Sequence, residues 1–443
     1  MRAFYEPALW ITQSFFSGIQ TCTTGCYARL GARYDELGKP TLAAENIRKA
    51  YDLREKVSER ERLYIETHYH ESVTGDLERA VQVFEVWQQT YPRDETPYNN
   101  LAYLYANIFG NYEKALQEAR EAVRLGPDQD NYVVLCALYL RLNRLNEAEA
   151  VLKQAEELKL QSELLLWDRY TLASLRGNTL EMEGPMAAAA GNRDAEDILH
   201  EVEAWSEAYY GRLKKARALF RQLREAAQHS GNIDSMAGRQ ANAADLEAYL
   251  GDAQQARADA EAASRLAPNR DVQVEAAFAL ALAGDARRAE ELAVGLEKSW
   301  PFDTGLRRFW LPTIRGAVAL ERKDAGKALE LLRAMSPYDM VAIGHMEPVY
   351  LRGLAYLMQG DGISAATEFQ KIIDYPGIVL QNPLGALARL GLARAYALQR
   401  DTAKSRAAYQ DFLTLWKDAD PDISILKEAK AEYAKLSAVR TGL

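Results

Sequence analysis

The chain has 443 residues, of which 48% are hydrophobic and 26% charged, and its formal net charge is -9. This balance is typical of a folded protein. The negative charge argues against a sequence-independent nucleic-acid binder, which needs a basic face. The sequence has no run of about 18 apolar residues, the length that a membrane span requires, and its size suggests several domains or an array of repeats.

Residues 1–25 do not follow the pattern of the rest of the chain, and we treat them as an atypical N-terminal segment. They contain one early basic residue, Arg2, and an apolar run that is interrupted at residues 12–14. A secretory leader needs a continuous apolar core. We therefore disfavour a secreted or lipid-attached protein and expect a cytoplasmic one.

One unit of two helices recurs from about residue 26 to residue 416. Each first helix ends at a turn residue, and successive turn residues are 33 to 40 positions apart, with one larger gap after Asn143. Periods of this size indicate a helical solenoid. The turn residues are Gly38, Gly75, Gly110, Asn143, Gly211, Gly251, Gly284, Lys323, Gly360 and Arg400.

A small residue stands five positions after every one of these turns. These residues are Ala43, Ala80, Ala115, Ala148, Ala216, Ala256, Ala289, Ala328, Ala365 and Ser405. A small side chain lets the second helix of a hairpin lie close against the first, where Gly31, Cys136 and Gly353 mark the crossing point. Pro92, Pro127, Pro268 and Pro301 each follow their turn by the same distance, and proline ends the second helix there.

This pattern resembles the tetratricopeptide repeat, a helix-turn-helix unit of about 34 residues. The resemblance implies an all-α fold, a right-handed α-solenoid of about ten hairpins. We divide it into a first block over 26–160, a degenerate repeat or hinge over 161–196 and a second block over 197–416. Residues 425–436 are expected to form a capping helix within the C-terminal segment 417–443, because the end of a repeat stack needs a polar outer face.

The sequence offers little support for catalysis. His68 and His70 stand two apart, so on a helix their rings point to different faces and do not converge on one metal ion. Three cysteines, Cys22, Cys26 and Cys136, do not make a disulfide framework in a chain of this length. No phosphate-binding loop, zinc-protease motif or nucleophile elbow occurs. We therefore expect a protein that is not an enzyme and that has no metal and no cofactor.

A repeat array offers a concave surface for a partner instead. In tetratricopeptide proteins the first helices line this surface, and the resemblance implies which positions face it. The expected partner-binding groove consists of Arg62, Ile65, Tyr69, Asn99, Tyr103, Trp205, Tyr209, Tyr350, Leu354 and Met358. The alternative is that the aromatic residues among them only pack between neighbouring repeats.

Three segments, 43–102, 377–398 and 407–423, carry a narrower resemblance, in runs such as GIVLQNPLGALARLGLARAYAL and AAYQDFLTLWKDADPDI. They are similar to the C-terminal repeat region of bacterial eukaryotic-like serine/threonine protein kinases. No kinase catalytic motif accompanies them.

Three functions stay open. The first is a protein-binding scaffold or sensor that holds a partner peptide or helix in its groove. The second is a detached or truncated regulatory arm of such a kinase, active in signalling. The third is a self-associating structural array.

Overall fold

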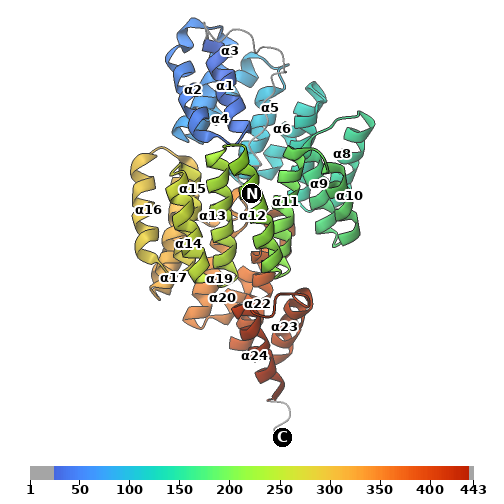
Figure 1. The fold of residues 1–443 in the computed structure, drawn as a ribbon, viewed down its shortest axis with the longest axis vertical. Helices are drawn as coiled ribbons and strands as arrows, with labels where there is room; N and C mark the ends of the chain where they lie inside the picture. The colour runs from blue at the N-terminus through green and yellow to red at the C-terminus, as the bar shows by residue number, and fades with distance from the viewer. Residues whose placement is uncertain (1–23, 439–443) are drawn as a thin grey trace.

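The computed structural model describes residues 24–438, and in that range the chain is built from α-helices without strands (Figure 1). Twenty-two of these helices form eleven hairpins, each made of a first helix, a tight turn and a second helix. The hairpins are α1 (Thr24–Glu36) with α2 (Pro40–Asp52), α3 (Glu59–His68) with α4 (Leu77–Thr90), α5 (Thr96–Asn107) with α6 (Tyr112–Leu125), α7 (Gln129–Arg141) with α8 (Leu145–Glu157), α9 (Glu163–Leu175) with α10 (Thr179–Ala189), α11 (Arg193–Tyr209) with α12 (Leu213–His229), α13 (Ile233–Tyr249) with α14 (Ala253–Leu266), α15 (Arg270–Leu282) with α16 (Ala286–Ser299), α17 (Leu311–Glu321) with α18 (Ala325–Arg333), α19 (Glu347–Gln359) with α20 (Gly362–Asp374), and α22 (Leu384–Leu398) with α23 (Thr402–Leu415).

Two further helices lie outside the hairpins. The short α21 (Pro376–Val379) connects the last two hairpins, and α24 (Ser424–Ala438) follows the last one. α24 is the capping helix that the sequence predicts, and it includes the whole of the predicted span 425–436.

All ten predicted turn residues adopt a left-handed backbone conformation, with φ between 55° and 86°. Glycine accepts this conformation at little cost, which explains its frequency at the turns. The sequence missed an eleventh turn of the same kind at Gly177, where φ is 68°. This turn joins α9 to α10, so the stretch 161–196 contains a hairpin of its own.

The small residues after the turns lie at helix crossings, as expected. All nine alanines and Ser405 have no exposed surface. Added Cβ atoms at Gly31 and Gly353 would lie 2.6 Å from side-chain atoms of Ile47 and Phe369, respectively. A larger residue at these positions would therefore push the two helices of a hairpin apart.

The residue directly after a turn often caps the second helix. The side chain of Asp76 accepts a hydrogen bond from the backbone amide of Arg79 at the start of α4. The same bond forms at Asn111, Asp252, Asp285, Asp324, Asp361 and Asp401. Each bond satisfies an amide that the helix leaves without a partner. At their other ends, α4, α6, α14 and α16 stop two residues before a proline, as the sequence predicts. These prolines are Pro92, Pro127, Pro268 and Pro301.

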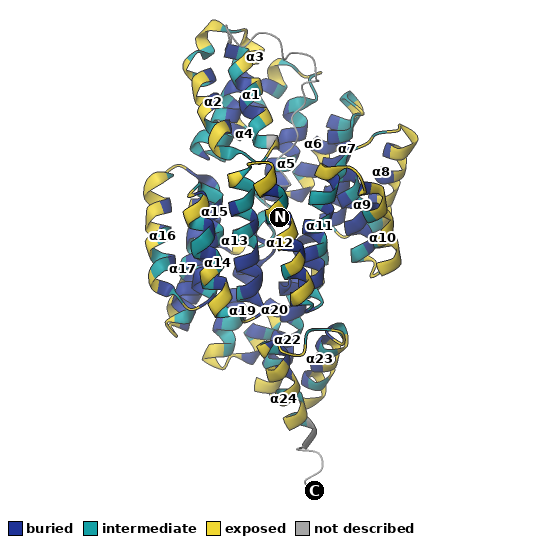
Figure 2. Ribbon diagram, in the orientation of Figure 1, coloured by how far each residue is buried: buried dark blue, intermediate teal, exposed yellow. Residues whose placement is uncertain are grey.

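The buried residues form a nearly continuous core between the layers of first and second helices, and exposed residues face outward (Figure 2). The largest hydrophobic cluster extends from Leu63 on α3 to Ala429 on α24. Each hairpin therefore buries its apolar faces against its neighbours, as in other repeat arrays.

We call each superhelical turn of the solenoid a coil. The solenoid winds so tightly that its second coil packs directly on its first. In Figure 1, α1 to α4 lie above α13 and α15, which follow them in the chain by about 200 residues. The intra-hairpin turns of one coil meet the inter-hairpin loops of the next. Asn232 Nδ2 donates to the carbonyl of Leu37 (2.9 Å), and the backbone amide of Thr304 donates to the carbonyl of Gly75 (2.8 Å).

Three further contacts repeat this arrangement along the chain. Tyr112 Oη donates to the carbonyl of Met340 (3.0 Å), and Arg141 Nη1 donates to that of Ile378 (3.3 Å). The backbone amide of Asp420 donates to the carbonyl of Gly211 (3.0 Å). These bonds join residues that are about six hairpins apart, and they close the gap between the two coils.

Candidate functional site: an acidic cavity between the coils

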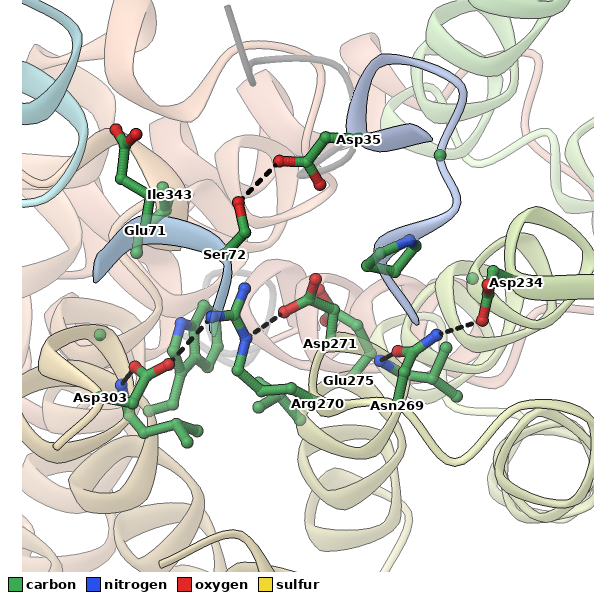
Figure 3. Close-up of a pocket in the computed structure, with 18 of the residues that line it drawn as sticks. Asp35, Glu71, Ser72, Asp234, Asn269, Arg270, Asp271, Glu275, Asp303 and Ile343 are labelled. Carbon is green, nitrogen blue, oxygen red and sulfur yellow. Dashed lines mark hydrogen bonds and ion pairs between the residues drawn. The ribbon is translucent and has the colours of Figure 1, made fainter. Parts of the chain in front are cut away.

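A cavity of about 280 Å³ lies inside the solenoid where the first coil faces the second (Figure 3). Its walls come mainly from the first helices α1, α3, α5, α11, α13 and α15 and from the loop before α17. The first residues of two second helices, Pro40 of α2 and Leu77 of α4, also line it. First helices therefore supply most of its helical lining.

Two π-helical segments reach this cavity. The first, Tyr69–Thr74, continues α3 and contributes Glu71 and Ser72 to the wall. The second, Leu306–Trp310, leads into α17 and contributes its two end residues. π-Helical turns are rare in proteins, and those that occur often lie at functional sites. They are the only two such segments within residues 24–438.

Acidic side chains dominate the wall. Seven carboxylic acids and two arginines line the cavity, and the lining contains no lysine. The acids are Asp35, Glu71, Glu201, Asp234, Asp271, Glu275 and Asp303, and the arginines are Arg239 and Arg270. Cations are therefore favoured in this cavity and anions are disfavoured.

Both arginines already bind carboxylates. Arg270 donates from Nε to Asp271 (2.7 Å) and from Nη1 to Asp303 (3.0 Å), so it lies between these two acids (Figure 3). Arg239 donates from Nη2 to Asp197 (2.9 Å), and its Nε lies 3.9 Å from Glu201.

Neutral donors hold two of the other acids. Asn269 Nδ2 donates to Asp234 Oδ1 (2.9 Å), and Ser72 Oγ donates to Asp35 Oδ2 (3.0 Å). Figure 3 shows both bonds at the margin of the cavity. Such bonds fix the direction of a carboxylate and leave its charge in place.

The half-buried Glu71 and the buried His68 form a pair of titratable groups at the π-helical end of α3. Oε2 of Glu71 lies 3.5 Å from Nδ1 of His68. Burial, with the negative charge of Asp35 as a second cause, raises the pKa of Glu71 to about 8. Burial lowers the pKa of His68 to about 4. At neutral pH both groups are therefore mostly uncharged.

Asn100 on α5 adds a buried acceptor to the same wall. The residue is 1% exposed, and its Nδ2 donates to the carbonyl of Thr96 (2.9 Å). Its Oδ1 is buried and receives no hydrogen bond within the described part of the chain. A buried acceptor that lacks a donor costs about 1–3 kcal/mol.

An apolar wall completes the cavity. It consists of Ala32, Leu77, Tyr103, Leu104, Ile108, Val272, Val274, Leu306, Trp310 and Ile343. The site therefore combines charged and apolar surface, as ligand pockets commonly do.

The predicted groove residues are scattered relative to this cavity. Tyr103 is the one of the ten that lines it. Ile65, Asn99 and Trp205 are at most 5% exposed, so they lie within the packing and not on a free surface. The Trp205 ring meets the ring of Phe220 edge to face, at a centroid distance of 6.2 Å.

The other predicted residues are partly accessible. Arg62, Tyr209 and Leu354 are half-buried, and Met358 is 42% exposed. Tyr69 is half-buried and stacks on Tyr51 with a centroid distance of 3.7 Å.

The ring of Tyr350 lies edge to face with that of Phe369. Packing between repeats therefore accounts for several of the aromatic residues in the predicted groove.

The sequence did not single out the acids of the cavity. Asp234 and Asp271 occupy the first turns of α13 and α15, where acidic residues are common because of the helix dipole. Asp303 lies in a loop between hairpins. A single sequence does not indicate that acids at such positions come together when two coils pack.

The absence of a metal site stays a prediction. Within residues 24–438, no three His, Cys, Asp or Glu side chains are placed so that they could hold a metal ion. Cys136 is free and buried, as its assignment to packing implies. Cys26 is disulfide-bonded, a state that is rare in cytosolic proteins. The cytoplasmic location stays a prediction.

None of the helices between residues 24 and 438 is both long and apolar enough to cross a bilayer.

The chain is similar in arrangement to several solved repeat structures. The crystal structure of yeast Tom70 has 12% sequence identity and a TM-score of 0.36, and the match covers 94% of this chain and 96% of that chain. The human IFIT1 dimer with m7Gppp-AAAA has 13% identity and a TM-score of 0.41 over 89% of this chain and 91% of that one. The P58(IPK) TPR domain has 13% identity and a TM-score of 0.26 over 87% of this chain and all of that one.

These values are low, and the assignment of the fold rests on the helices of the chain itself. No family model matches the sequence, and no curated protein does. The resemblance to kinase-associated repeat regions stays a prediction that none of these comparisons tests.

Proposed function

We propose that the chain is a non-catalytic scaffold that binds a segment of a partner protein on the inner, first-helix surface of its solenoid. The observation that carries this proposal is the cavity between the coils, which first helices line on both sides. It is a concave site that combines an apolar wall with many charged groups, and ligand sites are typically concave and partly apolar.

The partly exposed residues of the predicted groove extend this proposed surface. Tyr103 links the two, because it belongs to the predicted set and lines the cavity. Tyrosine supplies rigid contact area with a polar end, and it is enriched at positions that dominate binding energy. We therefore place Tyr103 at the centre of the proposed contact.

The acidic cavity also supports the expectation that nucleic acid is not the partner. Phosphate binding depends on basic side chains that displace counterions, and here acids outnumber arginines by seven to two. No observation in the structure favours the kinase arm or the self-associating array, and we propose neither.

Selection from a random peptide library displayed on phage tests the proposal. Enriched peptides should bind the parent protein and lose affinity for Tyr103→Ala. They should still bind Tyr375→Ala, which removes an exposed tyrosine outside the cavity. If no peptide is enriched, or if Tyr103→Ala binds as the parent does, the proposed site is wrong.

A further inference from the structure

The 23 residues that precede α1 differ in chemistry from the array that follows them. They lie outside the described range of 24–438. Two of them are charged, Arg2 and Glu6, in a chain with 26% charged residues. Five are aromatic, more than one in five against 9% in the whole chain: Phe4, Tyr5, Trp10, Phe15 and Phe16. A solvated segment is normally rich in charged residues and poor in aromatic ones, so residues 1–23 call for an apolar surface that covers their side chains.

The cavity between the coils offers such a surface close to the start of α1. Ala32 and Asp35 of α1 line the cavity. Ala32 follows Thr24, the first residue of α1, by eight positions, which is about 12 Å along a helix. An extended chain of this length reaches up to about 75 Å. Residues 1–23 are therefore long enough to reach the cavity wall from where α1 begins.

The size and the apolar lining of the cavity suit aromatic side chains. Its volume of about 280 Å³ is too small for a folded element and is comparable with one or two aromatic side chains. Leu104 contributes apolar atoms from the first coil, and Leu306 and Ile343 contribute them from the second. Aromatic rings bury a large apolar area when they pack on such side chains.

The charges of the wall are compatible with the same occupant. Seven acids and two arginines line the cavity, which disfavours an occupant rich in acids. Glu6 is the single acid among residues 1–23, and Arg2 is their single Lys or Arg. An acidic wall attracts the one and repels no more than the other.

We propose that residues 1–23 run along the inner surface of the solenoid and place aromatic side chains in the cavity. The chain thereby occupies its own binding site, and a partner segment binds by displacing residues 1–23. This inference rests on the proposed function and adds the regulation of the same site.

Covalent attachment makes even a weak contact effective. A short flexible tether gives an effective concentration on the order of 1 mM. If the free segment binds with a Kd of about 0.1 mM, roughly nine molecules in ten are occupied, and the affinity for a partner falls about tenfold. A partner that binds more tightly than this still displaces the segment.

The first test locates residues 1–23 in the full chain by photo-crosslinking. The crosslinking residue p-benzoyl-phenylalanine replaces Tyr5, Trp10 or Phe15, one at a time, and mass spectrometry identifies the residue to which it becomes attached within the monomer. At least one position should attach to the cavity wall, near Leu104 or Ile343. Attachment only to the outer side of α1 and α2 would make the segment a cap of the array and overturn the proposal. Attachment only between chains, or at no site, would overturn it as well.

The second test measures affinity, again in the full chain. A variant with serine in place of the five aromatic residues keeps the length of the segment and removes the proposed contact. Peptides selected on phage should bind this variant about tenfold more tightly than the parent. A matched variant with three polar residues of the same segment changed, Thr12→Ala, Gln13→Ala and Ser14→Ala, should bind as the parent does. Equal affinity of the parent and the serine variant, or equal gains in both variants, would overturn self-occupation and leave the scaffold function intact.

A synthetic peptide of residues 1–20 gives a readout that does not depend on covalent attachment. It should bind the serine variant, compete with the selected peptides and lose affinity when Tyr103→Ala is added to that variant. A peptide of the same composition in scrambled order should bind about tenfold more weakly. No binding, equal binding of the two peptides, or binding without competition would contradict the proposed contact.

The remaining outcomes separate this inference from its alternatives. If no peptide binds either the parent or the serine variant, the scaffold function is wrong, and this inference fails with it. Flotation with vesicles of phosphatidylcholine and phosphatidylglycerol tests a membrane-binding role of residues 1–23. If the parent floats, the serine variant does not, and the crosslinks miss the cavity, the segment binds membranes and the proposal is overturned.

Discussion

Trp416 Nε1 donates a hydrogen bond to the backbone oxygen of Tyr209, which lies 2.9 Å away and 207 positions earlier in the chain. The bond joins the end of the last hairpin to the turn that follows α11. The Trp416 side chain is 1% exposed at this joint. The two coils are therefore in direct contact at this joint.

Gly211 provides the clearest test of this joint. An added Cβ atom would lie 2.7 Å from Ala419 and 2.9 Å from the Trp416 ring, and the backbone there is left-handed. We expect Gly211→Ala to cost about 1 kcal/mol for the backbone and a further ~1–3 kcal/mol for overpacking. Urea unfolding measures the total loss in the free energy of unfolding.

Gly177→Ala is the matched control for that prediction. Gly177 has the same left-handed turn, with φ of 68°, and nothing lies within 4 Å of its added Cβ atom. This variant should show only the backbone cost. If the two variants lose the same stability, the contact between the coils does not form in solution.

The crossing of α7 and α8 is tested at Ala148, which has no exposed surface. Ala148→Phe should overpack this crossing and lower the free energy of unfolding by about 1–3 kcal/mol. Ala188→Phe, at an exposed position on α10, should change it by less than about 0.5 kcal/mol. An unchanged melting temperature for Ala148→Phe would show that the hairpin register is wrong.

Arg352 is the centre of a buried ionic network on α19. It is 1% exposed and donates to Asp339 (2.5 Å), to Glu368 (2.8 Å) and to the carbonyl of Leu332 (3.1 Å). Arg352→Met leaves the buried Glu368 and the half-buried Asp339 with Lys371, whose Nζ lies 3.3 Å and 3.8 Å from their carboxylates. The loss of the buried cation should cost up to about 3–5 kcal/mol. Adding Asp339→Asn and Glu368→Gln should restore part of the loss. No recovery in thermal melts would argue against a coupled network.

His68 predicts a loss of stability in acid. Burial lowers its pKa in the folded protein to about 4, against 6.5 for an ordinary histidine. Between these values the unfolded chain binds a proton that the folded chain does not, so the contribution of His68 to the free energy of unfolding falls as the pH falls from about 6.5 towards 4. Because Glu71 contributes a slope of opposite sign in this range, the test is a difference: the free energy of unfolding of the parent minus that of His68→Gln should fall between pH 7 and pH 5. Parallel slopes would mean that His68 is solvated.

Glu71 predicts a pH dependence of the opposite sign. Its pKa is about 8 in the folded protein and 4.5 in an ordinary glutamate. The folded chain holds the extra proton between these values, so the free energy of unfolding falls as the pH rises from about 4.5 to 8. Glu71→Gln should remove a slope of up to about 1.4 kcal/mol per pH unit. A slope that Glu71→Gln leaves unchanged would contradict the burial of this carboxyl group.

The repeat register explains how much of the fold could be predicted. The turns at Gly38 and Arg400, the buried alanines and the capping helix all follow from local rules of helix packing, which one sequence displays. The turn at Gly177 was missed because its hairpin lacks the small residue, with Met182 in place of the usual alanine. Prediction from local residue spacing fails where a repeat lacks one of the residues that define the spacing.

The contacts between coils could not be predicted in the same way. Whether Gly75 meets Thr304 depends on small rotations added over many hairpins, and no local pattern records their sum. The cavity acids shared this limit, since Asp35 and Asp271 become neighbours only when the solenoid closes. The expectation that first helices line the groove identified Tyr103. It also selected Ile65, which is fully buried by packing within the first two hairpins.

The joined coils have a mechanical consequence. An open solenoid yields under tension as a soft spring, because its neighbouring repeats tilt independently. Here the bonds from Asn232 to Leu37 and from Asp420 to Gly211 tie one coil to the next along the axis. The molecule should therefore resist stretching as a stiff column does, and it should extend only after these ties break together.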